Sequence, residues 1–186
     1  MNHPATTPKT INAFIKASAK SISNHAPVFV PYVEYEGMEK SQCFINVAKL
    51  VREQRGKAIT GWLFWEWPGV MIDGEHHAIW QKPDGTWEDV TPKADGETSI
   101  VFVRDDKAIY ANNRSILNKR FASPTNALAK EFIALKREAE MVVEPYRQTG
   151  QYGVPGEVME RLQAKESRAM NKWRRLLEKY GSSAKG

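Results

Sequence analysis

The sequence predicts an α+β fold in which one helix is followed by an antiparallel sheet, with two amphipathic helices at the C-terminal end. Three observations predict it. Residues 41–54 carry apolar residues at helical spacing. Residues 58–103 hold successive runs rich in aromatic and β-branched residues, separated by turn-forming Pro-Gly and Pro-Asp-Gly. From Asn126 onward the apolar residues return to the helical period.

The chain is expected to begin with a short helix and one strand. Residues 1–9 are polar and contain proline, so we expect them to be frayed. Apolar residues at helical spacing predict a helix within residues 10–23, and residues 26–36 are rich in valine and tyrosine, which predicts a strand. Pro31 lacks a main-chain donor, so this strand is expected at an edge or a bulge.

The next helix starts after Gly37, and it carries the only cysteine of the chain. Ser41 is expected to cap it, because a serine hydroxyl can accept a hydrogen bond from the first turn. Cys43 then lies in that first turn, near the positive end of the helix dipole. The expected buried stripe consists of Phe44, Val47, Ala48 and Val51.

Four strands are expected next, over residues 58–67, 70–81, 86–90 and 99–103. A hairpin turning at residues 83–85 pairs residues whose numbers sum to about 168, which follows from the antiparallel register. His77 is then opposite position 91 and close to Asp89. Residues 104–124 show no clear element, apart from a turn expected at Asn112-Asn113.

Two helices with apolar stripes complete the chain. The first starts at Asn126 and is expected to end at Pro145, since proline disrupts a helix interior. Residues 150–156 are expected to form a linker, Pro155 to open the second helix, and residues 181–186 to form a disordered tail. We therefore expect an α+β domain over residues 1–125 and a basic helical extension over residues 126–186.

Composition indicates a globular protein of the cytoplasm. No run of about 18 apolar residues is present, so no transmembrane helix is expected. The first 18 residues lack the apolar centre of a secretory signal, and a single cysteine excludes an internal disulfide. Of the net charge of +5, residues 126–186 contribute +4, from 12 Lys/Arg against 8 Asp/Glu.

Cys43 and His77 form the candidate catalytic pair. A cysteine is a useful nucleophile only as a thiolate, which a helix N-terminus and a neighbouring imidazolium both favour. The imidazole in turn needs an acceptor on its other ring nitrogen, and Asp89 is the candidate. In this prediction Cys43 attacks a carbonyl, His77 takes the thiol proton and later gives it to the leaving amine, and Asp89 orients His77.

The segment around these residues resembles the transglutaminase-like branch of the papain-like cysteine hydrolases. The matching motifs are QCF at Cys43, HHAIW at His77 and DGTWEDVTP at Asp89, all within residues 41–92. The resemblance implies a catalytic cysteine at a helix start, followed by histidine and aspartate on successive strands, and no cofactor. The segment between Cys43 and His77 is short, which favours hydrolysis of an amide or peptide bond over acyl transfer.

Further residues are candidates for the oxyanion hole and the cleft. The main-chain N–H of Cys43 is the natural first donor to an oxyanion. Gln42 is the candidate for a side-chain donor, and Asn46 lies one turn further along the helix. Trp62 and Trp80 either wall the site or fill the core.

Other interpretations compete with this one. A lone cysteine on an apolar helix is commonly inert packing. His76 points away from its neighbour in a strand, which makes it a surface or packing residue if His77 faces the thiol. Asp84 and Glu88 are alternatives to Asp89, although Asp84 fits a turn better. A metal site formed by Asp73, Glu75, His76 and His77 lacks the usual ligand spacing, so no metal is expected.

The basic C-terminal helices offer a second function. Residues 155–180 could contact nucleic acid or an acidic partner in a catalytically inactive binding module. The simpler interpretation is a solvated helix face packed on the core, with Trp173 buried. A peptide or amide substrate, with no membrane contact, remains the leading prediction.

Overall fold

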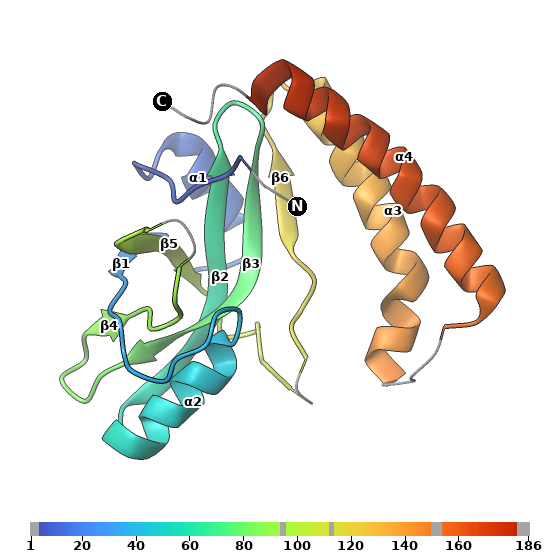
Figure 1. The fold of residues 1–186 in the computed structure, drawn as a ribbon. Helices are drawn as coiled ribbons and strands as arrows, with labels where there is room; N and C mark the ends of the chain where they lie inside the picture. The colour runs from blue at the N-terminus through green and yellow to red at the C-terminus, as the bar shows by residue number, and fades with distance from the viewer. Residues whose placement is uncertain (1–3, 94–95, 112–113, 150–153, 182–186) are drawn as a thin grey trace. The chain divides into compact units, whose positions relative to one another are not determined.

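The computed structural model describes residues 4–93, 96–111, 114–149 and 154–181 (Figure 1). Within these residues the fold is α+β, as the sequence predicts, with four helices and an antiparallel sheet of six strands. The turn expected at Asn112-Asn113, most of the expected linker and the expected tail lie outside the described residues.

The chain forms two compact units whose segments alternate along the sequence. One unit, called here the sheet unit, comprises Thr6–Glu66 and Ile72–Lys119. The other, the helical unit, comprises Met1–Ala5, Trp67–Met71 and Arg120–Gly186. The expected division at residue 126 differs from this one, because the turn of the β2–β3 hairpin belongs with the C-terminal helices.

The strands are paired in the order β1-β5-β2-β3-β4, and β6 also pairs with β3. Glu88 faces Trp80 and Trp87 faces Gln81, so the hairpin register sums to 168 as predicted. Residues 104–124 contain β6, which the sequence analysis did not predict because it is only four residues long and two of them are basic. The strands are β1 Val28–Pro31, β2 Lys57–Trp67, β3 Met71–Gln81, β4 Trp87–Glu88, β5 Ser99–Arg104 and β6 Lys119–Ala122.

In the sheet unit, the two ends of the strand path meet and close the sheet on itself. The chain beyond β1 and the chain beyond β4 are joined by a parallel bridge between Tyr32 and Asp89. The Asp89 N–H donates to the Pro31 carbonyl at 2.8 Å, and the Val33 N–H donates to the Asp89 carbonyl at 2.9 Å. The closed sheet surrounds an apolar core formed by Val30, Ile59, Leu63, Ile79, Ile100 and Phe102.

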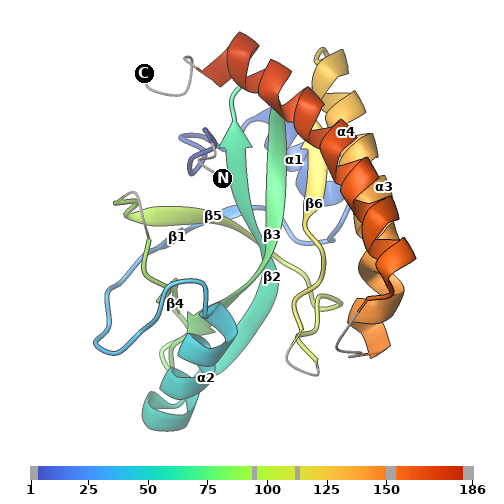
Figure 2. The same cartoon turned by 45° about the vertical axis from the view of Figure 1, so that its right-hand side comes forward.

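Helix α2, Cys43–Gln54, packs beside this core and forms a second apolar cluster with Ala78, Trp80 and Val90 (Figure 2). The expected cap is wrong: the helix is preceded by Gln42, and Ser41 adopts φ +60°. Its hydroxyl therefore does not occupy the cap position. The expected stripe is also displaced, because the buried residues of α2 are Cys43, Asn46, Val47 and Leu50, whereas Ala48 is exposed.

The N-terminal helix α1, Ala13–Lys20, lies within the predicted range. Its cap is Asn12, whose side-chain oxygen accepts a hydrogen bond from the Ile15 N–H at 2.9 Å. Ile15 and Ala19 are fully buried, and so the helix packs through the stripe that the sequence indicates.

In the helical unit, α3 (Ala127–Thr149) and α4 (Gly156–Tyr180) lie side by side in both views (Figures 1 and 2). The prediction that the first helix ends at Pro145 is wrong, since α3 continues through it. A proline removes only one main-chain donor, which a helix can accommodate by bending. The core of this unit is formed by Trp67, Val70, Met71, Ala129, Phe132, Ala169, Trp173 and Leu176.

Trp173 is buried, as expected from its place on the apolar stripe. It contacts Trp67 and Phe132, with ring centroids 5.2 Å apart in each pair. Among the described residues, no helix is long and apolar enough to cross a membrane.

The junction between α2 and β2 generates a first prediction. Gly56 has φ +80°, and a Cβ atom there would lie 2.1 Å from the Gln81 carbonyl oxygen. Gly56→Ala is expected to lower the free energy of unfolding by roughly 2 kcal/mol or more, because the left-handed strain and the backbone clash add together. Gly85→Ala is the matched control, with φ +89° but open space around the new methyl group. Equal losses in urea unfolding of the two variants would contradict a close approach at Gly56.

Candidate active site

Cys43 is the first residue of α2, and it is 7% exposed. The segment before the helix is tied down by Asn46. The Asn46 side chain accepts from the Glu39 N–H at 3.1 Å and donates to the Glu39 carbonyl at 2.8 Å. Gln42, the residue before Cys43, is exposed to solvent.

His77 lies on β3 and is buried. Its Nε2 is 3.1 Å from Oδ1 of Asp89, and the Cys43 side chain lies close enough to the ring to interact with it. Burial alone lowers the pKa of His77. The charge and hydrogen bond of Asp89, followed by those of Cys43, outweigh burial and raise the pKa from 6.5 to about 10. The imidazole therefore carries a proton at neutral pH.

Asp89 has no exposure to solvent, yet both of its carboxylate oxygens have partners. Oδ1 accepts from the Thr91 N–H at 3.1 Å in addition to its contact with His77. Oδ2 forms an ion pair with the ammonium of Lys93. Burial raises the pKa of Asp89, but the charges and hydrogen bonds of His77 and Lys93 lower it from 3.8 to about 2. The carboxylate is therefore ionised throughout the neutral range.

The three residues predicted as a triad are thus brought together, and each competing residue is engaged elsewhere. Asp84 accepts hydrogen bonds from the Thr86 N–H and hydroxyl, which makes it the turn residue that was expected. Glu88 accepts from the Tyr35 hydroxyl at 2.7 Å and from Lys82 at 3.2 Å. Asp89 is the carboxylate that contacts His77.

His76 lies in a separate environment. Its Nε2 is 2.9 Å from the Ala108 carbonyl, and its Nδ1 accepts from the Ile116 N–H at 3.0 Å. This pattern requires a neutral ring, because Nδ1 acts as an acceptor. Burial also lowers the pKa of His76. The ring contacts Phe44 and Trp62, so His76 is a packing residue and not a surface one.

Three of the four cleft candidates have structural partners. Trp62 donates to Asp105 at 2.9 Å, and Trp80 donates to the Arg55 carbonyl at 3.0 Å. Asn46, besides its contacts with Glu39, donates to the Thr91 hydroxyl at 3.4 Å. Their polar groups are therefore committed to holding the fold. Gln42 has an exposed side chain at the helix start, and it remains the candidate side-chain donor.

Lys93 is the site residue that the sequence analysis missed. Its side chain is only 5% exposed. The signal was the spacing of four residues from Asp89, but that spacing brings two side chains together dependably only in a helix, and residues 89–93 form no helix. Among the described residues, no three His, Cys, Asp or Glu side chains are grouped so that they could hold a metal ion.

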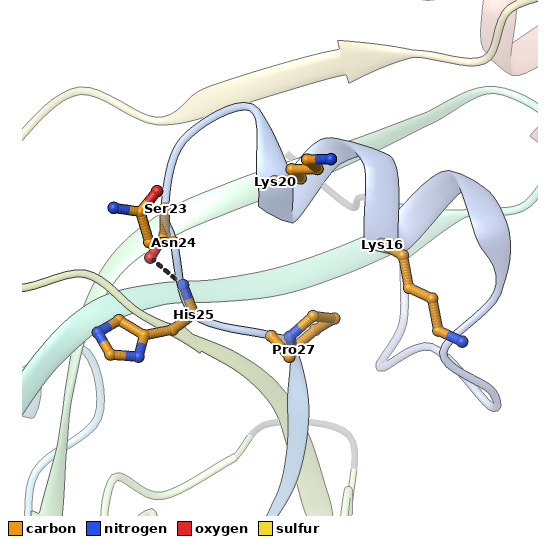
Figure 3. A pocket seen from close by; sticks show the side chains of 7 residues that line it. Lys16, Lys20, Ser23, Asn24, His25 and Pro27 are labelled. Atoms are coloured by element: carbon orange, nitrogen blue, oxygen red, sulfur yellow. Dashed lines mark hydrogen bonds between the residues drawn. The ribbon is translucent and has the colours of Figure 1, made fainter.

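A surface hollow of about 410 Å³ lies elsewhere in the sheet unit, around the end of α1. Figure 3 shows Lys16, Lys20, Ser23 and His25 along it, with the two lysine ammonium groups apart from one another. The His25 N–H donates to the Ser23 hydroxyl, and the imidazole is paired with exposed Asp106. These lining residues combine no nucleophile with a buried base, so the candidate chemistry belongs to Cys43.

Comparisons with protein-family models, with characterised proteins and with solved structures found no match. Any assignment of function to this chain therefore depends on the chemistry of its own residues.

Burial of Asp89 generates a prediction about acid stability. Its pKa in the folded protein lies below the ordinary value, so ionised Asp89 stabilises the fold above about pH 4, and this contribution is lost as the pH falls toward 2. In urea unfolding, the stability advantage of the wild type over Asp89→Asn should shrink by roughly 2 kcal/mol between about pH 5 and pH 2. An advantage that stays constant over this range would show that Asp89 is not held ionised by its partners.

Proposed function

We propose that this protein is a hydrolase of amide or peptide bonds that uses Cys43, His77 and Asp89 as a catalytic triad. The observation that carries the proposal is that buried His77 is paired with buried Asp89 and lies within interaction range of the Cys43 side chain. Each residue type matches its role, because a thiol, an imidazole and a carboxylate in this order form an activated nucleophile.

The proposed reaction begins with Cys43 as a thiolate and His77 as an imidazolium. The thiolate attacks the carbonyl carbon of the substrate, and the carbonyl electron pair moves onto oxygen. The main-chain N–H of Cys43 and the side chain of Gln42 are the proposed donors to this oxyanion. When the C–N bond breaks, the imidazolium gives its proton to the leaving amine, which leaves a thioester on Cys43 and a neutral His77.

Hydrolysis of the thioester returns the site to its starting state. Neutral His77 accepts a proton from water as the water oxygen attacks the thioester carbonyl. The second tetrahedral intermediate then expels the thiolate and releases the carboxylic acid. Asp89 stays ionised throughout and stabilises the imidazolium, and it keeps the ring aligned because its own main chain is fixed at the closure of the sheet.

The arrangement of elements supports the same proposal. Cys43 begins a helix, His77 lies on a strand of the following antiparallel sheet, and Asp89 follows the next strand. This is the order expected of a papain-like or transglutaminase-like hydrolase. We retain a peptide or amide as the proposed substrate and the cytoplasm as the proposed location.

The alternative of a basic binding arm is less well supported. Lys165 and Lys172 of α4 form ion pairs with Glu138 and Glu131 of α3. Part of the positive charge within residues 155–180 is therefore neutralised within the pair of helices, and less remains for phosphate groups.

The proposal predicts unusual thiol reactivity. Alkylation of Cys43 by iodoacetamide should remain fast at about pH 6, where an ordinary cysteine is almost entirely protonated and reacts slowly. His77→Ala should lower the rate at this pH by at least about tenfold, because the neighbouring imidazolium is lost. The measurement is the alkylation rate against pH, followed by mass spectrometry of the intact protein.

His76→Gln is the matched control for this experiment. It replaces a neighbouring buried histidine, and it should leave the low-pH alkylation of folded protein near the wild-type rate. A wild-type profile that rises only near pH 8.5, with no dependence on His77, would overturn the proposed function. With a reactive thiol established, a library of fluorogenic peptide amides should be turned over by wild type and not by Cys43→Ala.

A further inference from the structure

Lys93 occupies an unusual position for a lysine. Its side chain is 5% exposed, and the carboxylate that it contacts is completely buried. Taking an ammonium group out of water is unfavourable unless a partner compensates the charge. The partner here is Oδ2 of Asp89, and among the described residues no well-formed hydrogen bond from any other group reaches that oxygen.

The two oxygens of Asp89 therefore have divided tasks. Oδ1 accepts from His77 and from the Thr91 N–H. Within the part of the chain that the structure describes, the partner of Oδ2 is Lys93. A carboxylate held through both oxygens cannot rotate about its Cβ–Cγ bond, so the orientation of Oδ1 toward His77 depends on Lys93 as well as on Thr91.

The charges of the site alternate along one line of contacts. In the resting form proposed above, the Cys43 thiolate, the His77 imidazolium, the Asp89 carboxylate and the Lys93 ammonium follow one another. Their charges sum to zero. Without Lys93 this buried group would carry a net negative charge, which favours uptake of a proton from solvent.

We propose that Lys93 is a positioning residue for the triad, which acts through Asp89 by holding its carboxylate ionised and correctly turned toward His77. The inference depends on the proposed function, because it assigns Lys93 a role in forming the same thiolate–imidazolium pair. Lys93 touches neither the thiol nor the imidazole in this proposal.

The other groups around Asp89 do not replace Lys93. On the β1 side, Tyr32 bridges to the main chain of Asp89 and has its pKa raised by burial and by the charges of Glu34 and Asp89, so it is neutral at the relevant pH. From β3 the titratable group that faces Asp89 is His77, and Cys43 of α2 lies beyond His77. Lys93 contacts Oδ2 of the carboxylate, whereas the imidazole contacts Oδ1.

The test is the pH profile of Cys43 alkylation by iodoacetamide in Lys93→Met, Lys93→Arg and Lys82→Met. Lys93→Met should shift the acid limb of the alkylation profile to higher pH by about one pH unit. At a given low pH, the alkylation rate should then be about tenfold lower. Lys93→Arg keeps the charge and should restore most of the wild-type profile. Lys82 forms an ion pair with Glu88, the residue before Asp89, and its side chain is 32% exposed. Because Lys82 contacts Glu88 and not Asp89, Lys82→Met should leave the profile unchanged.

A double variant shows whether Lys93 acts through Asp89. In an Asp89→Asn background, adding Lys93→Met should shift the profile no further, because the carboxylate that Lys93 serves is absent. This pair also remains informative if Lys93→Met alone fails to fold, since no unpaired buried carboxylate is left in the double variant. A further shift in that background would overturn the inference.

The outcomes separate this inference from the proposed function. In the first outcome, Cys43 of the wild type is alkylated rapidly at low pH, and His77→Ala removes this reactivity. If the pH profile of Lys93→Met is then the same as that of the wild type, the role of Lys93 is refuted while the triad stands. If the wild-type thiol is slow at low pH, both are refuted. A shift in Lys93→Met that Lys93→Arg does not reverse would also contradict the inference, because any disruption of packing would produce it.

Discussion

The geometry of the candidate site depends on one residue at the closure of the sheet. The main chain of Asp89 bonds to the chain beyond β1, and its side chain contacts His77 on β3. A buried carboxylate is tolerated only when its charge is compensated. The fold provides this compensation with an imidazole, a main-chain N–H and an ammonium group. The residue that closes the sheet through its main chain therefore also aligns the histidine through its side chain.

Helix α2 is held at both of its ends, and this fixes the thiol. At the N-terminal end, Asn46 binds the main chain of Glu39 through both ends of its amide group. At the C-terminal end, the indole of Trp80 donates to the Arg55 carbonyl, and Gly56 allows the chain to pass directly over Gln81. A nucleophile needs this kind of support, since a small displacement from a catalytic base greatly reduces the rate.

The sequence predicted those parts of the structure that local chemistry determines. The turn at residues 83–85 sets the hairpin register, and the register brings Asp89 within reach of His77. The helices were identified because apolar residues recur at helical spacing over long segments of the sequence. The missed features depend on the tertiary fold. Lys93 reaches Asp89 through an irregular segment, and Ser41 adopts a left-handed conformation that its residue type does not indicate. Asn46 was expected to line the cleft, and Trp80 either to wall it or to fill the core. Both are buried, and both support the helix that carries the cysteine.

The alternation of the two units along the chain limits how this protein can be divided. Trp67, Val70 and Met71 lie at the turn of the β2–β3 hairpin, and they are buried against residues of α3 and α4. A fragment that stopped at residue 125 would retain the whole triad but expose these three large apolar side chains to water. Such a fragment would tend to self-associate. The C-terminal helices are therefore expected to keep these side chains out of water, even though none of the residues of α3 and α4 takes part in the proposed chemistry.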